Sequence, residues 1–538
     1  MIPSTPSWLS SAVFYEIYPQ SFLDTNGDGI GDLEGIIRKL DYIGSLGCNA
    51  IWMNPCFVSP FRDAGYDVAD FYQVAPRYGT NADIQRLFHA AHERGIKVCL
   101  DLVAGHTSDQ HPWFKQSCRA TPNPYSNWYI WTSSIWETAP AMVHGYGERD
   151  GNFLANFFYH QPALNYGYAN PDPEKPWQLP VTHPDVRAVR AELFKIMRFW
   201  LDLGADGFRV DMAGSLVKGD TDLKETMALW NEVRAMFDRE YPNAVLMSEW
   251  SNPVKSILGG FHVDFMLAFG DPPAYTSLLR KEKGRDLNPS SKGGHSYFSR
   301  EGKGDIREFL DSYLQHYSAT RQHGYITIPS GNHDVPRLSL GRTREEIEAA
   351  FALIMTMPGI PFIYYGDEIG LREGVGLTSK EGGYSRTGAR TPMQWDQSPN
   401  AGFSTADALQ LYLPIDPDPQ RPNVAVQEKE TGTLLNAIRG LVRFRKEHST
   451  LFSEGDFLPL FAEPARYPFV YQRSDGTRKF IIAVNPSAQP ALAGFALDKS
   501  IGALEKVAGH DVKVVLKKGQ CEMAMPGISY AFFEARDR

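Results

Sequence analysis

The chain has 538 residues, of which 43% are hydrophobic and 22% charged, and its formal net charge is −9. These proportions are ordinary for a globular protein. The basic residues form no block or stripe of the kind that neutralises phosphates, which excludes nucleic acid as an expected partner. The sequence also has no run of about 18 apolar residues, so we expect no membrane partner.

The N-terminal sequence MIPSTPSWLSSAVFYEIYPQ lacks the charged segment and apolar core of a secretory signal. The cysteines are odd in number and match no zinc or redox spacing; they are Cys48, Cys56, Cys99, Cys118 and Cys521. Disulfides are rare in the cytoplasm. We therefore expect reduced thiols and a cytoplasmic location.

The first two thirds of the chain alternate helical and apolar segments. Amphipathic spacing predicts helices at 33–46, 84–94 and 186–203. Short apolar runs predict strands at Asn49–Asn54, Lys97–Val103, Gly207–Asp211, Ala244–Trp250, Val263–Met266, Tyr325–Pro329 and Pro361–Tyr365. Apolar strands between helices indicate a parallel sheet covered on both faces. With about eight such units, the predicted fold class is α/β, a (β/α)8 TIM barrel.

Two parts of the chain depart from this alternation. Residues 106–183 are rich in Trp, Tyr, Asn and Pro and are too long for a simple loop, which predicts a subdomain inserted after the third strand. Beyond a predicted helix at 434–446, short strands with turns predict a C-terminal antiparallel β domain. The expected domains are a barrel in two parts (1–105 and 184–453), the inserted subdomain (106–183) and a C-terminal β-sandwich (454–538).

Polar residues stand at the ends of several predicted strands. They are Asp101 with His106, Arg209 with Asp211, Glu249, and His333 with Asp334. The carboxyl ends of barrel strands bear the active site, so we expect these side chains to converge. A single acid of this kind is more often a structural ion pair than a catalytic group. Three acids at three strand ends favour a catalytic site.

The acids suit hydrolysis of a glycosidic bond with retention, which needs two carboxylates about 5–5.5 Å apart. Arg209 lies two residues before Asp211, on the same side of the strand, and keeps that carboxylate ionised as a nucleophile requires. Glu249 has the apolar neighbours Met247 and Trp250, which favour the raised pKa of a general acid. His106, or His333 with Asp334, suits the binding of sugar hydroxyls.

The chain resembles glycoside hydrolase family 13, the α-amylase family, and within it the oligo-1,6-glucosidase, α-glucosidase and trehalose synthase branch. The matching segments run from residue 13 to about 396: AVFYEIYPQSFLDTNGDGIGDLEGI, GYDVADF, DLVAGHTSD, GFRVDMA, SEW, GNHDVPR, IYYGDEIG and ARTPMQWD. The resemblance implies Asp211 as nucleophile, Glu249 as general acid/base and Asp334 as stabiliser of the transition state.

The resemblance also implies contacts to the substrate. His106, Arg209 and His333 would bind the sugar in subsite −1, and Tyr66 would be its stacking platform. Asp63 and Arg390 match a pair that binds the terminal glucose and closes the pocket in exo-acting members. We therefore expect a retaining, exo-acting α-glucosidase on short oligosaccharides or disaccharides, as a monomer or homodimer.

The segment DTNGDGIGD offers carboxylates and an amide at alternate positions, which suits a cation bound by oxygen. It is not an EF-hand, because the twelfth position is Gly35 rather than Glu. The resemblance implies one structural Ca²⁺ ion, with Mg²⁺ as the alternative occupant, held by Asp24, Asn26, Asp28, the carbonyl of Ile30, and Asp32.

Two positions depart from the family pattern. Gly105 replaces an Asn that helps bind an interdomain calcium in classical amylases, so no second metal site is expected. Met212 follows the nucleophile, where the branch has Val for α-1,6 and Thr for α-1,4 preference, so the linkage stays open. An RLDRD-type segment of the sucrose isomerases is also absent.

Two other functions compete with hydrolysis. An α-glucosyltransferase or isomerase such as trehalose synthase uses the same acids and the same motifs. The inert relatives that form heavy chains of amino-acid transporters are less consistent with this chain, because they need a membrane anchor and lack the acids that this chain keeps.

Overall fold

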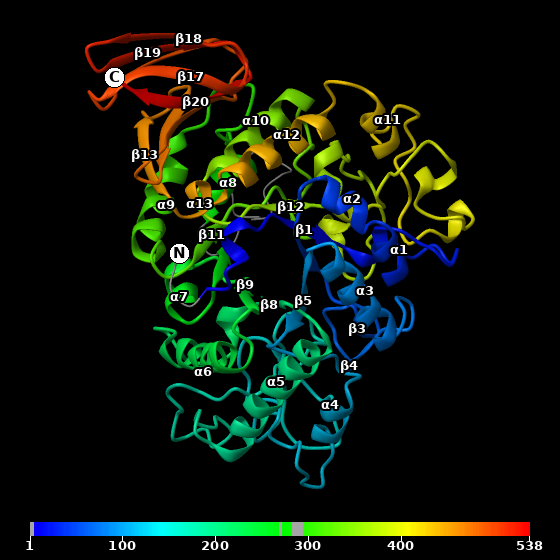
Figure 1. The fold of residues 1–538 in the computed structure, drawn as a ribbon. Helices are drawn as coiled ribbons and strands as arrows, with labels where there is room; N and C mark the ends of the chain where they lie inside the picture. The colour runs from blue at the N-terminus through cyan, green and yellow to red at the C-terminus, as the bar shows by residue number, and fades with distance from the viewer. Residues whose placement is uncertain (1–4, 268–271, 282–293) are drawn as a thin grey trace.

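The computed structural model describes residues 5–267, 272–281 and 294–538. Its centre is a barrel of parallel strands (Figure 1). The strands are β1 (Phe14–Ile17), β2 (Ala50–Met53), β5 (Lys97–Val103), β8 (Gly207–Asp211), β9 (Val245–Ser248), β10 (Val263–Phe265), β11 (Tyr325–Thr327) and β12 (Phe362–Tyr364). They pair in the order β11-β10-β9-β8-β5-β2-β1-β12. The two ends meet where the Ser330 amide donates to the Phe362 carbonyl at 3.0 Å. The predicted TIM barrel is confirmed.

Helices pack around the described barrel. They are α1 (Leu33–Arg38), α2 (Leu40–Ser45), α3 (Asn81–Glu93), α4 (Pro112–Ser117), α5 (Pro184–Leu203), α6 (Lys224–Glu240), α7 (Pro253–Leu258), α8 (Pro272–Leu279), α9 (Ile306–Thr320), α10 (Arg344–Thr356), α11 (Val424–Lys429), α12 (Leu434–Glu447) and α13 (Ser449–Glu454). In α5, Pro184 occupies the first turn and Gly204 ends the helix with φ 122°. Its buried stripe includes Leu193, Met197 and Trp200, so the helix faces the barrel with one side.

The structure differs from the predicted elements in two places. The segment predicted as one helix at 33–46 is two short helices, because the chain leaves helical geometry at Lys39 (φ −107°, ψ 6°). Strand β1 is absent from the predicted set, since Glu16 interrupts its apolar run. In the barrel that glutamate is fully buried.

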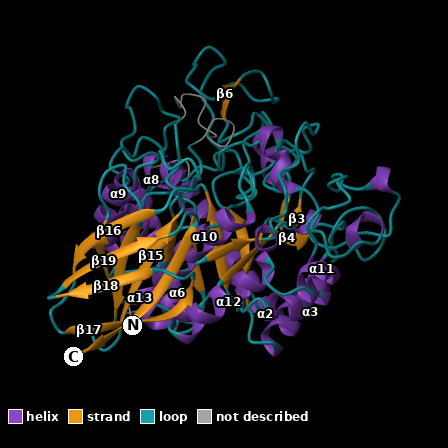
Figure 2. Cartoon of the chain, turned by 90° about the horizontal axis from the view of Figure 1, so that it is seen from above, coloured by secondary structure: helices purple, strands orange, loops and turns teal. Residues whose placement is uncertain are grey.

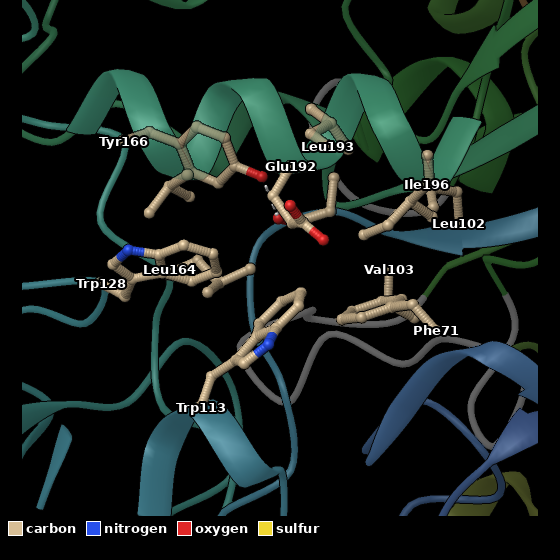
Figure 3. Close-up of a pocket in the computed structure, with 12 residues that line it drawn as sticks. Phe71, Leu102, Val103, Trp113, Trp128, Leu164, Tyr166, Glu192, Leu193 and Ile196 are labelled. Atoms are coloured by element: carbon tan, nitrogen blue, oxygen red, sulfur yellow. Dashed lines mark hydrogen bonds between the residues drawn. The ribbon is translucent and has the colours of Figure 1, made fainter. Parts of the chain in front are cut away.

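The inserted segment after β5 packs against the barrel through aromatic rings (Figure 3). Trp113 and Trp128 contact each other edge to face at 4.9 Å, and Trp113 also packs on Phe71. The Tyr166 hydroxyl donates to the Ala104 carbonyl just beyond β5. The cavity between these groups measures only about 10 Å³, the room of one water molecule, so it is a packing gap rather than a ligand site.

Other short strands lie outside the barrel: β3 (Phe57–Val58) pairs with β4 (Asp70–Val74), and β6 (Met142–Val143) pairs with β7 (Phe153–Leu154). The C-terminal part forms two antiparallel sheets, seen together in Figure 2. One contains β13 (Asp456–Phe461), β14 (Phe469–Ser474), β15 (Lys479–Asn485), β20 (Ser529–Asp537) and β17 (Ile501–Gly509), and the other β16 (Ala491–Ala496), β19 (Gln520–Met525) and β18 (Lys513–Lys517).

The two C-terminal sheets share one apolar core. Val470 and Ile481 from the larger sheet cluster with Phe495 and Met523 from the smaller one. This confirms the predicted antiparallel β domain; its exact borders remain a prediction. All five cysteines are free thiols. None of the helices in the described part of the chain is long and apolar enough to cross a membrane.

The closure of the barrel predicts a sensitive position. Gly359 precedes β12 with φ +97°, and a Cβ there would lie 1.7 Å from the Ile326 carbonyl of β11. We expect Gly359→Ala to lower the free energy of unfolding by about 2 kcal/mol or more, through steric overlap and backbone strain. Urea unfolding followed by circular dichroism measures the change.

The matched control is Gly440→Ala in α12, where an added Cβ meets nothing within 4 Å. There the same substitution should stabilise by about 0.5–1 kcal/mol, because alanine favours the helix. Equal unfolding midpoints for the two variants would show that an added Cβ at Gly359 does not destabilise the barrel.

Candidate active site

A cavity of about 750 Å³ opens at the carboxyl ends of the barrel strands. Its lining comes from the strand ends, the inserted segment and the loop after β12: Asp63, Tyr66, His106, Phe157, Phe158, Asp211, Met212, Gly214, Ser215, Glu249, Trp250, Asp334, Tyr384, Ser385 and Arg386. All three predicted catalytic acids are in this set. A cavity of this size suits a small ligand rather than a polymer cross-section.

The guanidinium of Arg209 lies at the floor of the cavity and touches three carboxylates. Its Nη1 is 2.9 Å from Asp101 and 3.2 Å from Asp211, and its Nη2 is 2.6 Å from Glu249. Arg209 is only 1% exposed. One buried cation therefore holds the two predicted reacting carboxyls next to each other.

Glu249 is also tied by its backbone to the loop of Asp211. The Glu249 amide donates to the Val210 carbonyl at 2.9 Å, and its carbonyl accepts from the Ala213 amide at 3.2 Å. Its Oε2 accepts from the amide of Met212 at 3.0 Å. Met212 has a left-handed backbone (φ 44°), an unfavourable conformation that aims its amide at Glu249.

Both carboxyls of this pair retain a proton more readily than free acids do. Burial, followed by the charge of Glu249, raises the pKa of Asp211 well above its ordinary value against the pull of Arg209. The expectation that Arg209 keeps this carboxyl ionised is therefore wrong for the free protein. Burial also raises the pKa of Glu249, and Arg209 opposes that rise too. Both carboxyls contact the same guanidinium, so they lie close together, as the short spacing of a retaining site requires.

Asp334 lies in a different electrostatic environment. Its Oδ1 accepts from Arg386 at 2.8 Å and from Arg390 at 3.0 Å, and its Oδ2 is 3.3 Å from His333 Nε2. Burial alone would raise the pKa of Asp334, but His333 and the two arginines hold it well below the usual range. Asp334 is therefore ionised, whereas burial favours the protonated forms of Asp211 and Glu249.

His333 and Tyr66 form the wall beside Asp334. Their rings stack with centroids 5.3 Å apart, and the Tyr66 hydroxyl is 2.7 Å from His333 Nε2. Burial lowers the pKa of His333 well below its ordinary value, so the ring is neutral. Its Nδ1 lies 3.0 Å from Glu16 Oε1 and 3.0 Å from Asn54 Nδ2. Both ring nitrogens of His333 therefore have partners within the protein, which fix the imidazole behind Tyr66 and Asp334.

His106 faces the same cavity from the end of β5. Its Nε2 is 3.2 Å from the Tyr66 carbonyl, and its Nδ1 is 3.0 Å from Asn156 Nδ2. Burial lowers the pKa of His106 to about 3, so this ring is neutral too. The Asn156 amide also reaches the sulfur of Met212 at 3.8 Å, which links the inserted segment to the residue after Asp211.

Asp63 is held at the edge of the cavity by Gln161, whose amide donates to it at 2.7 Å. Its ion partner is Arg386, at 3.6 Å, whereas Arg390 binds Asp334 and the His333 carbonyl. Burial raises the pKa of Asp63 to about 7 against the opposing charge of Arg386. The expected Asp63–Arg390 pairing thus appears as a chain of contacts from Asp63 through Arg386 and Asp334 to Arg390.

Several residues at the site were not singled out from the sequence. Arg386 stands four residues before Arg390 in one 3-10 helix (Tyr384–Arg390), and that spacing was the available signal. Glu16 is a charged residue within an apolar run. Gln161 and Asn156 lie in the irregular inserted segment, where nothing in the pattern marks them.

The loop Asp24–Asp32 lies apart from this cavity and packs on residues 403–412. Asp24, Asn26 and Asp28 each accept a hydrogen bond from the amide two residues later, at 2.9–3.0 Å. Asp32 caps α1 by accepting from the Gly35 amide. No ready group of three or more His, Cys, Asp or Glu side chains for a metal occurs among the described residues. The donors of the loop are all oxygens, and carboxylates keep lone pairs for a hard cation, so their chemistry fits calcium.

A family model described as "Alpha amylase, catalytic domain" matches residues 16–455. The chain belongs to the α-amylase family, glycoside hydrolase family 13. The barrel architecture agrees with this membership, and the protein is an enzyme of this family.

Relatives with different activities are similar to this family member. It is 33% identical over 527 residues to the trehalose synthase/amylase TreS of Mycobacterium tuberculosis (strain CDC 1551 / Oshkosh), covering 90% of this chain and 82% of the relative. It is 31% identical over 533 residues to the oligo-1,6-glucosidase of Parageobacillus thermoglucosidasius, covering 89% and 90%. The solved isomaltulose synthase from Erwinia rhapontici NX5 superposes with a TM-score of 0.80 at 25% identity, covering 99% of each chain.

Proposed function

We propose that the protein is a retaining, exo-acting α-glucosidase that cleaves terminal α-glucosyl residues from short oligosaccharides or disaccharides. The observation that carries the proposal is the buried Arg209, which touches Asp211 and Glu249 with adjacent nitrogens. Two carboxyls this close, sharing a proton, suit a double displacement.

The first step breaks the glycosidic bond. The carboxylate of Asp211 attacks the anomeric carbon while the proton of Glu249 passes to the departing oxygen, leaving a β-glucosyl ester on Asp211. In the second step Glu249 takes a proton from water, and the water oxygen displaces Asp211 to give α-glucose. Asp334, which the arginines keep ionised, stabilises the positive charge that develops on the sugar ring in both steps.

The polar groups around the acids support an exo mode. Asp63 is 4% exposed at the cavity edge, and the inserted segment holds it through Gln161. With Arg386 and Arg390 it surrounds the position where the hydroxyls of a terminal glucose would bind. Tyr66, His106 and His333 supply the remaining hydrogen bonds of that subsite. A substrate that continued past this end would leave buried polar groups without partners.

A transferase or isomerase is the second candidate, and two observations favour it. The trehalose synthase/amylase from M. tuberculosis is 33% identical over 90% of this chain. The cavity lining is also partly apolar and includes Phe157, Trp250 and Met212. Aromatic faces retain a sugar better than a water molecule, which favours transfer from the same intermediate.

Azide separates the two catalytic roles. With p-nitrophenyl α-glucoside, we expect Glu249→Ala and Asp211→Ala to lose about 10²–10⁴-fold in kcat, and azide to restore part of the rate of each. In Glu249→Ala azide displaces Asp211 from the β-ester and gives α-glucosyl azide. In Asp211→Ala it attacks the substrate directly and gives the β-anomer. The anomeric coupling in the proton NMR spectrum identifies the product.

The exposed acid of α2, Asp41, provides the control. Asp41→Ala should keep full activity and should form no more glucosyl azide than the parent enzyme does. The same anomer from both catalytic variants, or the reversed assignment, would refute the roles of Asp211 and Glu249.

The fate of the glucosyl group separates hydrolysis from transfer. With maltose at increasing concentration, we expect glucose as the main product at low concentration and new disaccharides only as maltose accumulates, because water and sugar compete for the ester. Chromatography of initial products gives the ratio. A constant, high yield of one new disaccharide at every concentration would instead indicate an intramolecular isomerase.

We also propose that the loop Asp24–Asp32 binds one Ca²⁺ ion with a structural role. Asp24, Asn26, Asp28 and Asp32 supply side-chain oxygens, and Ile30 a carbonyl. The loop packs through Asp24 on Phe403 and Ser404, so a cation there would join the first strand–helix connection to the segment after β12.

Ligand linkage gives the test of this cation site. Adding Ca²⁺ after dialysis against EDTA should raise the apparent Tm by several degrees, since an ion that binds only the folded chain stabilises it. Asp28→Ala removes an exposed member of the loop and should abolish the shift while kcat stays within about 2-fold, because Asp28 lies outside the cavity. An equal rise in Tm for parent and variant would show that the ion binds elsewhere. A parallel titration with Mg²⁺ identifies the preferred ion.

A further inference from the structure

A buried carboxyl on β10 is directed at the end of β9 and the turn after it. Asp264 is fully buried. Its Oδ1 accepts from the Ser248 hydroxyl at 2.7 Å and from the amides of Trp250 at 3.2 Å and Ser251 at 3.3 Å. Its Oδ2 accepts from the Asn252 amide at 2.9 Å. Four donors from one short segment therefore converge on a single side chain that does not itself reach the cavity.

The turn that these donors belong to has an unfavourable backbone. Ser251 has φ 54°, in the left-handed region that residues other than glycine rarely adopt. Such a conformation persists only where the surrounding structure holds it. Asp264 accepts from the amide of Ser251 and from the amides of its two neighbours in the chain. The Ser251 hydroxyl in turn accepts from the Leu267 amide at 3.0 Å. The turn is thus held by partners from β10 and the residues after it.

Glu249 lies inside the segment that Asp264 binds. On its other side, Glu249 is tied to β8 through Val210, Met212 and Ala213. We propose that Asp264 is a positioning residue for the general acid: it fixes the turn after β9 so that the Glu249 carboxyl is aimed at the departing oxygen. This inference rests on the proposed role of Glu249 as acid/base.

The chemistry of the contacts explains why a carboxylate occupies this position. All four partners donate a hydrogen bond, so both oxygens of Asp264 must accept. An ionised carboxylate is acceptor-only and satisfies this requirement at both oxygens. Burial raises the pKa of Asp264 to about 7, although hydrogen bonds from Ser248 and from the backbone favour the ionised form. An asparagine has the same shape but would turn an amino group toward at least one of the donors.

Asp264→Asn tests the proposal through the leaving group. A misplaced general acid harms only substrates that need protonation as they depart. With phenyl α-glucoside, whose phenol leaves poorly, we expect kcat/KM to fall about 10–100-fold, and with p-nitrophenyl α-glucoside less than about 3-fold. The two aryl groups occupy the same subsite and differ mainly in leaving ability, so a general loss of structure would lower both values alike.

Asp206→Asn is the matched control. Asp206 is a buried carboxyl at the opposite end of the barrel, where it accepts from the Val98 amide at 2.9 Å and pairs with Lys97 at 2.8 Å and His92 at 2.6 Å. Its loss should lower the Tm but change kcat/KM for the two aryl glucosides by the same factor. Ser248→Ala removes one donor from Asp264 and should show the selective loss to a smaller degree, which keeps the test valid if Asp264→Asn does not fold.

The outcomes are distinguishable. A uniform loss on both substrates in Asp264→Asn and Ser248→Ala, as in Asp206→Asn, would overturn the positioning role, and so would no loss on either substrate. Glu249→Gln must show a strong dependence on the leaving group in its own right. If it does not, the proposed role of Glu249 fails, rather than the inference about Asp264.

Discussion

The active site depends on one buried guanidinium. Arg209 is 1% exposed and contacts Asp101, Asp211 and Glu249 at once. Taking charges out of water costs several kcal/mol for each ion unless partners compensate. A single cation cannot neutralise three anions, and burial raises the pKa of Asp211 and of Glu249, which favours a retained proton at this pair. A general acid needs that retained proton, and here it follows from burial and from a shortage of positive charge.

Asp334 shows the opposite outcome of the same constraint. It is buried beside the same cavity, yet Arg386 and Arg390 both donate to one of its oxygens. The pKa of Asp334 is therefore held low while burial raises the pKa of Asp211 and of Glu249. Carboxyls whose environments push their pKa values apart take different roles in a reaction. The distribution of arginines thus divides three neighbouring acids into a proton-sharing pair and a permanent anion.

Much of this arrangement could be predicted from the sequence, because a barrel brings all strand ends to one edge. Asp211 and Glu249 stand at the ends of apolar runs that are typical of buried strands, and the barrel brings these strand ends together. The partners on neighbouring strands or loops could not be found in the same way. In the sequence, Asp264 is a single acid within a short apolar run. Only the parallel pairing of β10 with β9 brings it beside the donors at the end of β9.

The direct contacts of Asp63 could not be predicted from the sequence, for a different reason. The motif suggested Arg390, but which arginine of a pair one turn apart faces a given acid depends on how an irregular loop packs. Arg386 takes that place, and Arg390 turns to Asp334. Likewise, the break at Lys39 divides a helical pattern whose spacing alone is continuous, because periodicity carries no information about a local departure in ψ.

The choice between water and sugar in the second step is governed outside the catalytic motifs. In the proposed mechanism, Asp211, Glu249 and Asp334 act in the same way on either acceptor, so they would contribute nothing to the preference. The lining that differs in chemistry is the outer wall, where Phe157 and Trp250 present apolar surface beside the acids. Water binds weakly to such surface, while a departing sugar loses little by remaining there. Hydrolysis therefore requires that the first product leave before the ester is attacked. In the proposed mechanism, the lifetime of that product in the cavity, rather than the strength of the acids, would set the balance between hydrolysis and transfer.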